Sequence, residues 1–305
     1  MPTTVILGAS NDYHALHIHK ALQTKGADAL LFDTSSYPHL STISWDPFKQ
    51  RGRLNTQDRA LDFDRINSVF WSTAGHANAD LQHAEFNSAI ALNDTTSMLK
   101  TFFLEERIYW CNSWQAMQFH KIKPRQLAVA AAIGLNIPHT YTGNDAVDIS
   151  EFVACNQDAI YKPVYGGAHC ARVTKSQLTQ AHLKKVLKIS PVTIQQYIPG
   201  INIRTFVIGE VVFSAAIESN AVDYRTESEP RITPMQIPAE LARKAIHLKT
   251  AFGMQWTAID WRKTNNDDYY FLEANPSPMF IHFEQQTGYP ITDSLLKLLL
   301  QSPLL

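Results

Sequence analysis

The chain has 305 residues, and its 27 lysine and arginine residues against 28 aspartate and glutamate residues give a formal net charge of −1. Hydrophobic residues make up 45% of the chain, so a disordered protein is excluded and the apolar material suffices for a core. The near-zero charge excludes a protein that binds nucleic acid mainly through a large basic surface. No stretch reaches the roughly 18 consecutive apolar residues of a membrane span. Three widely spaced cysteines without a C-x-x-C pattern are typical of a reducing compartment, so we expect a cytoplasmic protein.

The first third of the chain alternates short apolar strands with helical stretches. Strands are expected at residues 5–7, 29–32 and 66–71, and a long helix is expected at about 79–105. This alternation favours a parallel sheet with crossover helices. Gly8 ends the first strand, yet Gly8-Ala9-Ser10-Asn11-Asp12 lacks the further glycines of a dinucleotide-binding turn. We therefore interpret this segment as a plain strand-to-helix turn.

The rest of the chain is richer in strands. After a helix that starts near Lys121 and stops near Gly134, we expect strands at 159–164, 192–198, 203–208, 211–217, 256–261 and 269–275. Helices are expected at 178–187, 239–252 and 293–300. Since the pattern changes near residues 115–125 and 190, we predict three lobes, at 1–115, 116–190 and 191–305. The fold class is α/β, with a parallel-sheet lobe at the N-terminus followed by two α+β lobes.

The densest group of polar residues lies in the last predicted hairpin. Glu273 and Asn275 are two residues apart on a strand, so their side chains project to the same face, and Asp260 joins them if the two strands pair antiparallel. Two carboxylates and an amide oxygen suit Mg²⁺, which commonly takes one or two carboxylates together with phosphate oxygens. The alternative is an exposed polar face of a hairpin.

Two further features fit a phosphate-binding site. Gly166 and Gly167 follow a strand that contains Lys162, and glycines let backbone N–H groups turn toward an anion. Arg204 and Arg225 lie in or beside apolar strands, and their planar guanidinium groups match phosphate or carboxylate oxygens. The alternatives are an ordinary hairpin turn for the glycines and surface ion pairs for the arginines.

Taken in order, these motifs resemble the ATP-grasp superfamily of carboxylate–amine ligases. The resemblance covers about residues 110–290 and rests on Lys123-Pro124-Arg125-Gln126-Leu127, Tyr161-Lys162-Pro163-Val164 with Gly166-Gly167, Gln195-Gln196-Tyr197-Ile198-Pro199-Gly200, Ile203-Arg204, Asp260 and Phe271-Leu272-Glu273-Ala274-Asn275-Pro276. It implies an ATP-grasp fold in which two α+β lobes enclose the nucleotide.

Within the superfamily, the chain is most similar to the branch of the ribosomal-protein glutamate ligase and the macrocyclases of microviridin-type peptides. The features that suggest this branch are Asp12-Tyr13-His14-Ala15 with Phe32-Asp33-Thr34-Ser35-Ser36-Tyr37-Pro38, then Asp223-Tyr224-Arg225, and the segment 283–291. The chain departs from the branch at Asn202, where an acidic residue is common, and at Phe70-Trp71-Ser72-Thr73, which arginines often follow.

The resemblance also implies a role for each matching residue. Lys123 and Lys162 would contact the ATP phosphates, and the loop at Gly166 and Gly167 would cover them. The nucleotide would also be bound by Gln195, Gln196, Tyr197 and Ile198, whose backbone would read adenine, and by Asn202. The metal would be held by Asp260, Glu273 and Asn275, and catalytic roles would fall to Lys162, Arg204 and Arg225.

The activity implied by the resemblance is ATP-dependent ligation with Mg²⁺ as cofactor. A substrate carboxylate would take the γ-phosphoryl group of ATP, and an amine or hydroxyl would capture the resulting acyl phosphate, forming an amide or ester. The substrate would be a peptide or a small-molecule carboxylate, and neither nucleic acid nor a membrane would be a partner. Both a monomer and a homodimer are consistent with the sequence. The alternative is a regulator that binds ATP on the same fold without turnover.

Overall fold

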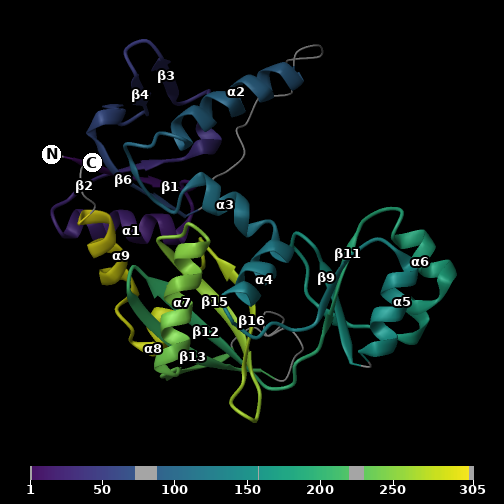
Figure 1. Ribbon diagram of the computed structural model, residues 1–305. Coiled ribbons are helices and arrows are strands. Elements are labelled where there is room, and N and C mark those ends of the chain that lie inside the picture. The colour runs from purple at the N-terminus through teal and green to yellow at the C-terminus, as the bar shows by residue number, and fades with distance from the viewer. Residues whose placement is uncertain (1, 73–87, 157, 220–229, 302–305) are drawn as a thin grey trace. The chain divides into compact units, whose positions relative to one another are not determined.

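The computed structural model describes residues 2–72, 88–156, 158–219 and 230–301 (Figure 1). The chain forms two compact units. Unit 1 contains the chain up to Met117, Gly253–Trp256 and the residues from Ser277 on, and unit 2 contains Gln118–Phe252 and Thr257–Pro276. Each unit combines helices with sheets, which confirms the predicted α/β class. The three predicted lobe boundaries stay a prediction. Among the described residues, every helix is too short or too polar to cross a membrane.

Unit 1 is built around the predicted parallel sheet. Its strand order is β2 (Asp28–Phe32), β1 (Thr3–Leu7), β6 (Ile66–Trp71), β7 (Tyr109–Cys111), and each neighbouring pair is parallel. All residues of β1 and β6 are buried, including the polar Thr3, Thr4, Asn67 and Ser68. The core beside the sheet includes Phe32, Phe63, Trp71, Phe102 and Trp110.

Helices and a second sheet complete unit 1. Its helices are α1 (Tyr13–Thr24), α2 (Ser88–Phe103), α8 (Ile281–Thr287) and α9 (Ile291–Leu300), and the division between the units falls within α3 (Trp114–His120). Asp12 accepts hydrogen bonds from the N–H groups of His14 and Ala15 and so begins α1. Helix α9 packs beside α1 (Figure 1). An antiparallel sheet consists of β3 (Thr42–Asp46), β4 (Arg51–Asn55) and β5 (Ala60–Asp62). The first part of the predicted helix at 79–105, residues 79–87, lies outside the described residues.

Unit 2 contains an antiparallel sheet of four strands with one apolar and one polar face. The order is β10 (Ala171–Arg172), β9 (Ala159–Pro163), β11 (Val192–Gln196), β8 (Thr140–Gly143). Helices α5 (Ala146–Cys155) and α6 (Gln180–Val186) lie on one side of this sheet (Figure 1). Ile194 of β11 packs into the cluster beneath them, so Thr193 and Gln195, one position away on either side, belong to the opposite face.

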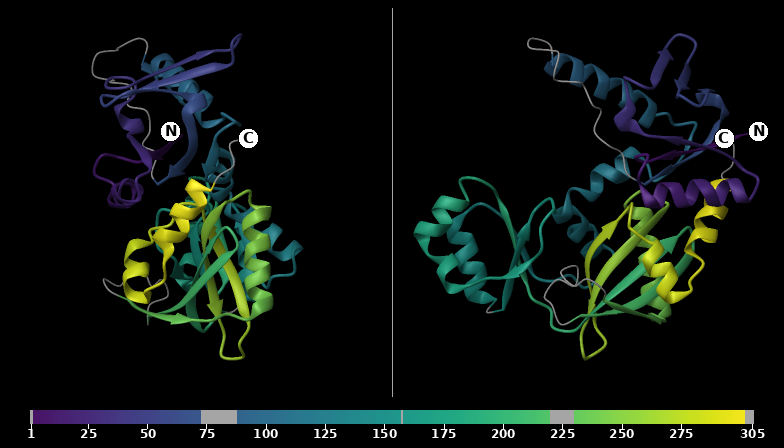
Figure 2. Two further views of the ribbon diagram at one scale, coloured as in Figure 1. Left: turned by 90° about the vertical axis from the view of Figure 1, so that its left-hand side faces the viewer. Right: turned by 180° about the vertical axis from the view of Figure 1, so that it is seen from behind.

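The second sheet of unit 2 has five antiparallel strands and contains the predicted hairpins. The order is β14 (Arg231–Met235), β13 (Val211–Glu218), β12 (Ile201–Ile208), β15 (Trp256–Lys263), β16 (Tyr269–Asn275). Helix α7 (Ala239–Ala251) runs along this sheet, as Figures 1 and 2 show. Helix α4 (Lys123–Ala132) contacts β16.

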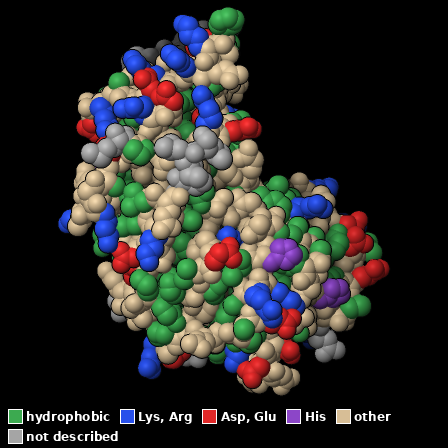
Figure 3. Space-filling view, turned by 60° about the vertical axis from the view of Figure 1, so that its left-hand side comes forward, with side chains coloured by type: hydrophobic (Ala, Val, Ile, Leu, Met, Phe, Trp, Pro, Cys, Tyr) green, Lys and Arg blue, Asp and Glu red, His purple; other side chains and the backbone are tan. Residues whose placement is uncertain are grey.

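The register of the last hairpin brings the predicted metal ligands into adjacent positions. Asp260 of β15 lies directly opposite Glu273 of β16, and Ala258 lies opposite Asn275. The antiparallel pairing assumed from the sequence is therefore confirmed. On the surface, acidic and basic side chains are interspersed over the face seen in Figure 3, in keeping with the near-zero net charge.

Candidate functional site

Most of the predicted site residues line one cavity within unit 2. Both sheets and the first residue of α4 contribute to its lining. The predicted residues that line it are Lys123, Lys162, Gly166, Gln195, Gln196, Tyr197, Ile198, Asn202, Asp260 and Glu273. Residues from five separate segments of the chain therefore meet around one space, as the ordered set of motifs predicts.

Four predicted residues stand apart from this lining. Arg204 reaches the cavity indirectly, because it bonds to Asp260. Gly167 and Asn275 are not among the lining residues, although Gly167 follows Gly166 and Asn275 is two positions from Glu273 on β16. Arg225 lies outside the described residues, so its catalytic role stays a prediction.

The first charged pair of the site joins helix α4 to strand β16. Lys123 is the first residue of α4, next to Pro124 in the first helical turn, and its Nζ donates a hydrogen bond to Glu273 Oε2. The Lys123 and Glu273 side chains are 14% and 24% exposed. Burial raises the pKa of Glu273, but the Lys123 ammonium, followed by that of Lys162, outweighs it and lowers this pKa to about 2. Glu273 is therefore a carboxylate at neutral pH.

The second charged pair lies on neighbouring strands of the five-stranded sheet. Arg204 of β12 donates from Nε to Asp260 Oδ1 and from a terminal nitrogen to Asp260 Oδ2, both at 2.8 Å. Their side chains are 19% and 15% exposed. Two parallel N–H···O bonds fix both the direction and the spacing of the groups, which a lysine would not do.

The donor set around these pairs fits a magnesium ion. Asp260 and Glu273 face each other across β15 and β16, and Asn275 adds an amide oxygen donor two positions from Glu273. These are hard oxygen donors of the kind that Mg²⁺ takes alongside phosphate oxygens. The described residues contain no group of three or more His, Cys, Asp or Glu side chains that could hold a metal by themselves. Ligand phosphate and water would therefore complete the coordination.

The loop after β9 requires its glycines. Gly166 has a φ of +113° and Gly167 a φ of +91°, a region that residues with a Cβ rarely adopt. A Cβ on Gly166 would lie 3.4 Å from Lys123 Cε, so this loop passes close to the first cation. Lys162, on the strand before the loop, donates from Nζ to Gln195 Oε1 at 3.0 Å.

A buried arginine that the sequence analysis did not single out organises the segment after β11. Arg262, 7% exposed, donates to the Ile198 carbonyl at 3.0 Å, to Asn202 Oδ1 at 2.9 Å and to the Tyr197 hydroxyl at 3.3 Å. The Arg172 guanidinium lies 4.0 Å from the centre of the Tyr197 ring. The Asn202 Nδ2 is a buried donor that has no partner among the described residues.

A second missed residue holds the strand that contains Glu273. Gln126 of α4 is fully buried, donates to the Ala274 carbonyl at 3.0 Å and accepts from the Ala274 N–H at 2.9 Å. Since β16 is the edge of its sheet, this amide takes the place of a further strand. The signal for Gln126 was its spacing of three from Lys123, which puts both residues on the same side of one helix.

Comparison with known proteins identifies a family and several related structures. The family model of the RimK-like ATP-grasp domain matches residues 120–299. No curated protein matches the chain. The solved ATP-grasp ligase PsnB, complexed with minimal precursor, Mg and ADP, is 25% identical with a TM-score of 0.83, over 98% of this chain and 97% of that chain.

Two further structures are similar over nearly their whole length. Macrocyclase MdnC from Microcystis aeruginosa MRC, bound with precursor peptide MdnA, is 22% identical with a TM-score of 0.86, over 98% of this chain and 100% of that chain. A RiPP-associated ATP-grasp ligase from Chryseobacterium gregarium, in complex with ADP and a leader and core peptide, is 19% identical with a TM-score of 0.86, over 99% and 98%. These likenesses confirm the predicted ATP-grasp fold. The family model matches more than half of this chain, so the chain belongs to the RimK-like ATP-grasp family.

Proposed function

We propose that this protein is an ATP-dependent ligase that joins a substrate carboxylate to an amine or hydroxyl and releases ADP and phosphate. ATP would be its nucleotide substrate and Mg²⁺ its metal. Membership of the ATP-grasp family supports this proposal, as do the ADP and Mg in the PsnB complex. The precursor peptides bound by PsnB and MdnC support a peptide as the carboxylate substrate.

One observation carries the proposal: two cation–carboxylate pairs meet at one cavity. Lys123 pairs with Glu273, and Arg204 pairs with Asp260. Phosphoryl transfer needs cations beside the phosphates and carboxylates for a metal, and little other protein chemistry. An ATP-binding regulator without turnover would bind the same phosphates but would have no transferring phosphoryl group for Arg204 to stabilise. The pairs therefore favour the ligase over the regulator.

The proposed reaction has two steps. In the first, an oxygen of the substrate carboxylate attacks the γ-phosphorus of ATP, the bond from that phosphorus to the β,γ-bridging oxygen breaks, and ADP leaves. In the second, the amine nitrogen or hydroxyl oxygen attacks the carbonyl carbon of the acyl phosphate. The bond from that carbon to the phosphate oxygen then breaks, phosphate leaves, and the attacking atom loses its proton.

The chain's own residues would bind and orient the reacting groups. Lys123 and Lys162 would bind phosphate oxygens, and Arg204 would stabilise the charge on the transferring phosphoryl group or the acyl phosphate. Asp260, Glu273 and Asn275 would hold Mg²⁺, which supplies further positive charge to the phosphates when it is bound. Binding of ATP would require Lys123 and Arg204 to exchange their carboxylate partners for phosphate oxygens.

Trapping of the acyl phosphate tests the ligase chemistry directly. The purified protein is incubated with Mg·ATP and a candidate precursor peptide, and ADP release is followed together with the peptide mass. Each bond formed removes one water from the peptide. Hydroxylamine added to the reaction should convert the acyl phosphate to a hydroxamate on the carboxylate side chain. We expect peptide-dependent ADP release, loss of water and hydroxamate formation.

Matched variants assign the chemistry to the cavity. Lys162→Ala and Glu273→Ala should abolish ADP release, whereas Lys188→Ala and Glu151→Ala change the same residue types at exposed positions and should not. If Lys162→Ala and Glu273→Ala both keep the activity, the site assignment is wrong. If Mg·ATP binds but no carboxylate substrate releases ADP, the regulator replaces the ligase.

A further inference from the structure

The polar face of the four-stranded sheet carries a line of side chains that leads to Lys162. In the antiparallel register, Lys162 of β9 lies opposite Thr193 of β11, and Gln195 lies opposite Thr140 of β8. Gln195 is two residues beyond Thr193, so Lys162, Gln195 and Thr140 share one face. Lys162 and Gln195 are diagonal neighbours, a spacing that long side chains bridge.

Hydrogen bonds connect these residues in one direction. Lys162 Nζ donates to Gln195 Oε1 at 3.0 Å, and Gln195 Nε2 donates to Thr140 Oγ1 at 2.8 Å. The Thr140 hydroxyl donates in turn to the Pro138 carbonyl at 2.7 Å. A lysine ammonium can only donate and a carbonyl can only accept. The two ends of this series of hydrogen bonds therefore require the same orientation of the Gln195 amide.

Gln195 lines the cavity, but the polar atoms of its side chain are bonded within the sheet. The residue is only 1% exposed. A neutral amide also holds the Lys162 ammonium in place without cancelling its charge, which a glutamate at this position would do. The hydrogen bond to Gln195 thus fixes the position of the ammonium and leaves its charge intact.

We propose that Gln195 is a positioning residue whose side chain, held by Thr140, sets the Lys162 ammonium for the phosphates of the nucleotide. This inference rests on the proposed function, in which Lys162 binds phosphate. It changes the role expected from the sequence, where Gln195 belongs to the segment whose backbone would read adenine. The side chain of Gln195 acts through Lys162, on the phosphate end of the ligand.

The test compares two ligands that differ only in their phosphates. Dissociation constants for Mg·ATP and for adenosine are measured by calorimetry for the wild type, Gln195→Met and Gln195→Glu, which nearly preserve the side-chain volume. We expect Mg·ATP to bind roughly tenfold more weakly to both variants, the effect of about one hydrogen bond to a charged group. Adenosine, which has no phosphate for Lys162, should bind to them as to the wild type.

A matched pair on β8 separates positioning from general damage to the sheet. Thr140→Val removes the hydroxyl that holds the Gln195 amide. Thr142→Val removes the next hydroxyl on the same face, whose partner is Thr193. Only Thr140→Val should weaken the binding of Mg·ATP. In a Lys162→Met background, Gln195→Met should cause no further loss of affinity, because the group through which it acts is gone.

Each result decides the inference. A similar loss of adenosine and Mg·ATP affinity would mean that Gln195 contacts the base or sugar and would overturn it. Unchanged Mg·ATP affinity in Gln195→Met, or equal effects of Thr140→Val and Thr142→Val, would overturn it as well. A wild type that binds no Mg·ATP refutes the proposed function together with this inference, whereas normal wild-type binding with unaffected variants refutes the inference alone.

Discussion

Replacing Lys123 by methionine should destabilise the metal-free protein by an amount that the structure allows us to estimate. Lys123 and Glu273 form a pair with 14% and 24% side-chain exposure. Burial alone raises the pKa of Glu273, yet Lys123 and Lys162 bring this pKa from 4.5 to about 2. A shift of that size corresponds to about 3 kcal/mol of stabilisation of the carboxylate at neutral pH. Most of it disappears in Lys123→Met, because Lys123 is the largest favourable cause.

The pH dependence of this loss has a definite sign. A pKa that is lower in the folded state stabilises the fold above the unfolded-state pKa, and the stabilisation is lost as the pH falls toward the folded-state pKa. For Glu273, the window therefore runs from about pH 4.5 down to about pH 2. The difference in unfolding free energy between the wild type and Lys123→Met should fall from about 3 kcal/mol at about pH 7 to about 2 kcal/mol at about pH 3.5.

Urea unfolding in the presence of EDTA measures this difference without metal. Lys188→Met is the matched control, since Lys188 is exposed and outside the cavity. Its unfolding free energy should match that of the wild type. A loss in Lys123→Met below about 1 kcal/mol, the range of exposed ion pairs, would show that the pair is solvated. A loss that grows as the pH falls would contradict the assigned direction of the Glu273 pKa.

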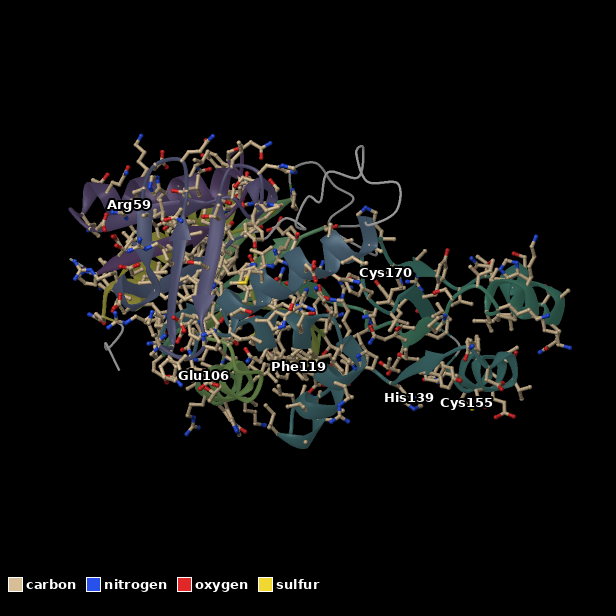
Figure 4. All side chains as sticks on the ribbon, turned by 90° about the horizontal axis from the view of Figure 1, so that it is seen from above. Arg59, Glu106, Phe119, His139, Cys155 and Cys170 are labelled. Carbon is tan, nitrogen blue, oxygen red and sulfur yellow. The ribbon has the colours of Figure 1, made fainter. Side chains whose placement is uncertain are left out.

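Three more predictions concern the same cavity. Asn202→Asp should raise the free energy of unfolding by roughly 1 kcal/mol, because a carboxylate strengthens the bond to the buried guanidinium, and urea unfolding that shows a loss would contradict this. Mg·ATP should slow alkylation of the half-buried cavity residue Cys170 but not of exposed Cys155, which lies well apart from it in Figure 4, as peptide mapping by mass spectrometry would detect. Alanine at Gly167, where φ is +91° and a Cβ meets no atom within 4 Å, should cost about 1 kcal/mol of unfolding free energy from backbone strain alone. At Gly166, where φ is +113° and a Cβ would lie at ordinary contact distance from Lys123 Cε, the cost should be similar, so urea midpoints that match the wild type in both alanine variants would refute this account.

Long apolar strands and paired polar positions could be predicted from the sequence. Strand β6 (Ile66–Trp71) has the predicted bounds, and every one of its residues is buried. The facing positions of Asp260 and Glu273 follow from two strands and a polar turn, since a hairpin admits few registers. These features depend on local sequence alone.

Elements that bury few side chains were not predicted from the sequence. Helix α5 (Ala146–Cys155) buries only Ile149 fully, and Asp145 is its N-cap. In β4, glycine and leucine provide the buried positions between exposed arginines, a pattern too short to distinguish from a loop. The residues that bury these faces belong to other elements, as Phe63 does against Gly52 of β4, and the pattern within a single element does not reveal them.

The supporting side chains of the cavity could not be predicted because their partners are distant in sequence. Arg262 bonds to groups about 60 residues away, and only the fold shows that it is buried. The register between β15 and β16 shifts after Asp260, where Leu272 of β16 is left without an opposite residue, and local sequence does not predict this irregularity. Gln195 was assigned to the nucleotide by its motif, and its side-chain partners became visible only with the register of β8, β9 and β11.

The two charged pairs explain how a nearly neutral chain can prepare a site for a highly charged ligand. In the metal-free protein, Lys123 neutralises Glu273 and Arg204 neutralises Asp260, so no like charges are forced together before the ligand arrives. Nucleotide alone would draw the cations away and leave two carboxylates facing each other across β15 and β16. A metal bound alone would take the carboxylates from Lys123 and Arg204 and leave these two cations without their carboxylate partners at the cavity. On the proposed function, each ligand therefore compensates for the charge that the other exposes, so we expect nucleotide and metal to bind more tightly together than separately.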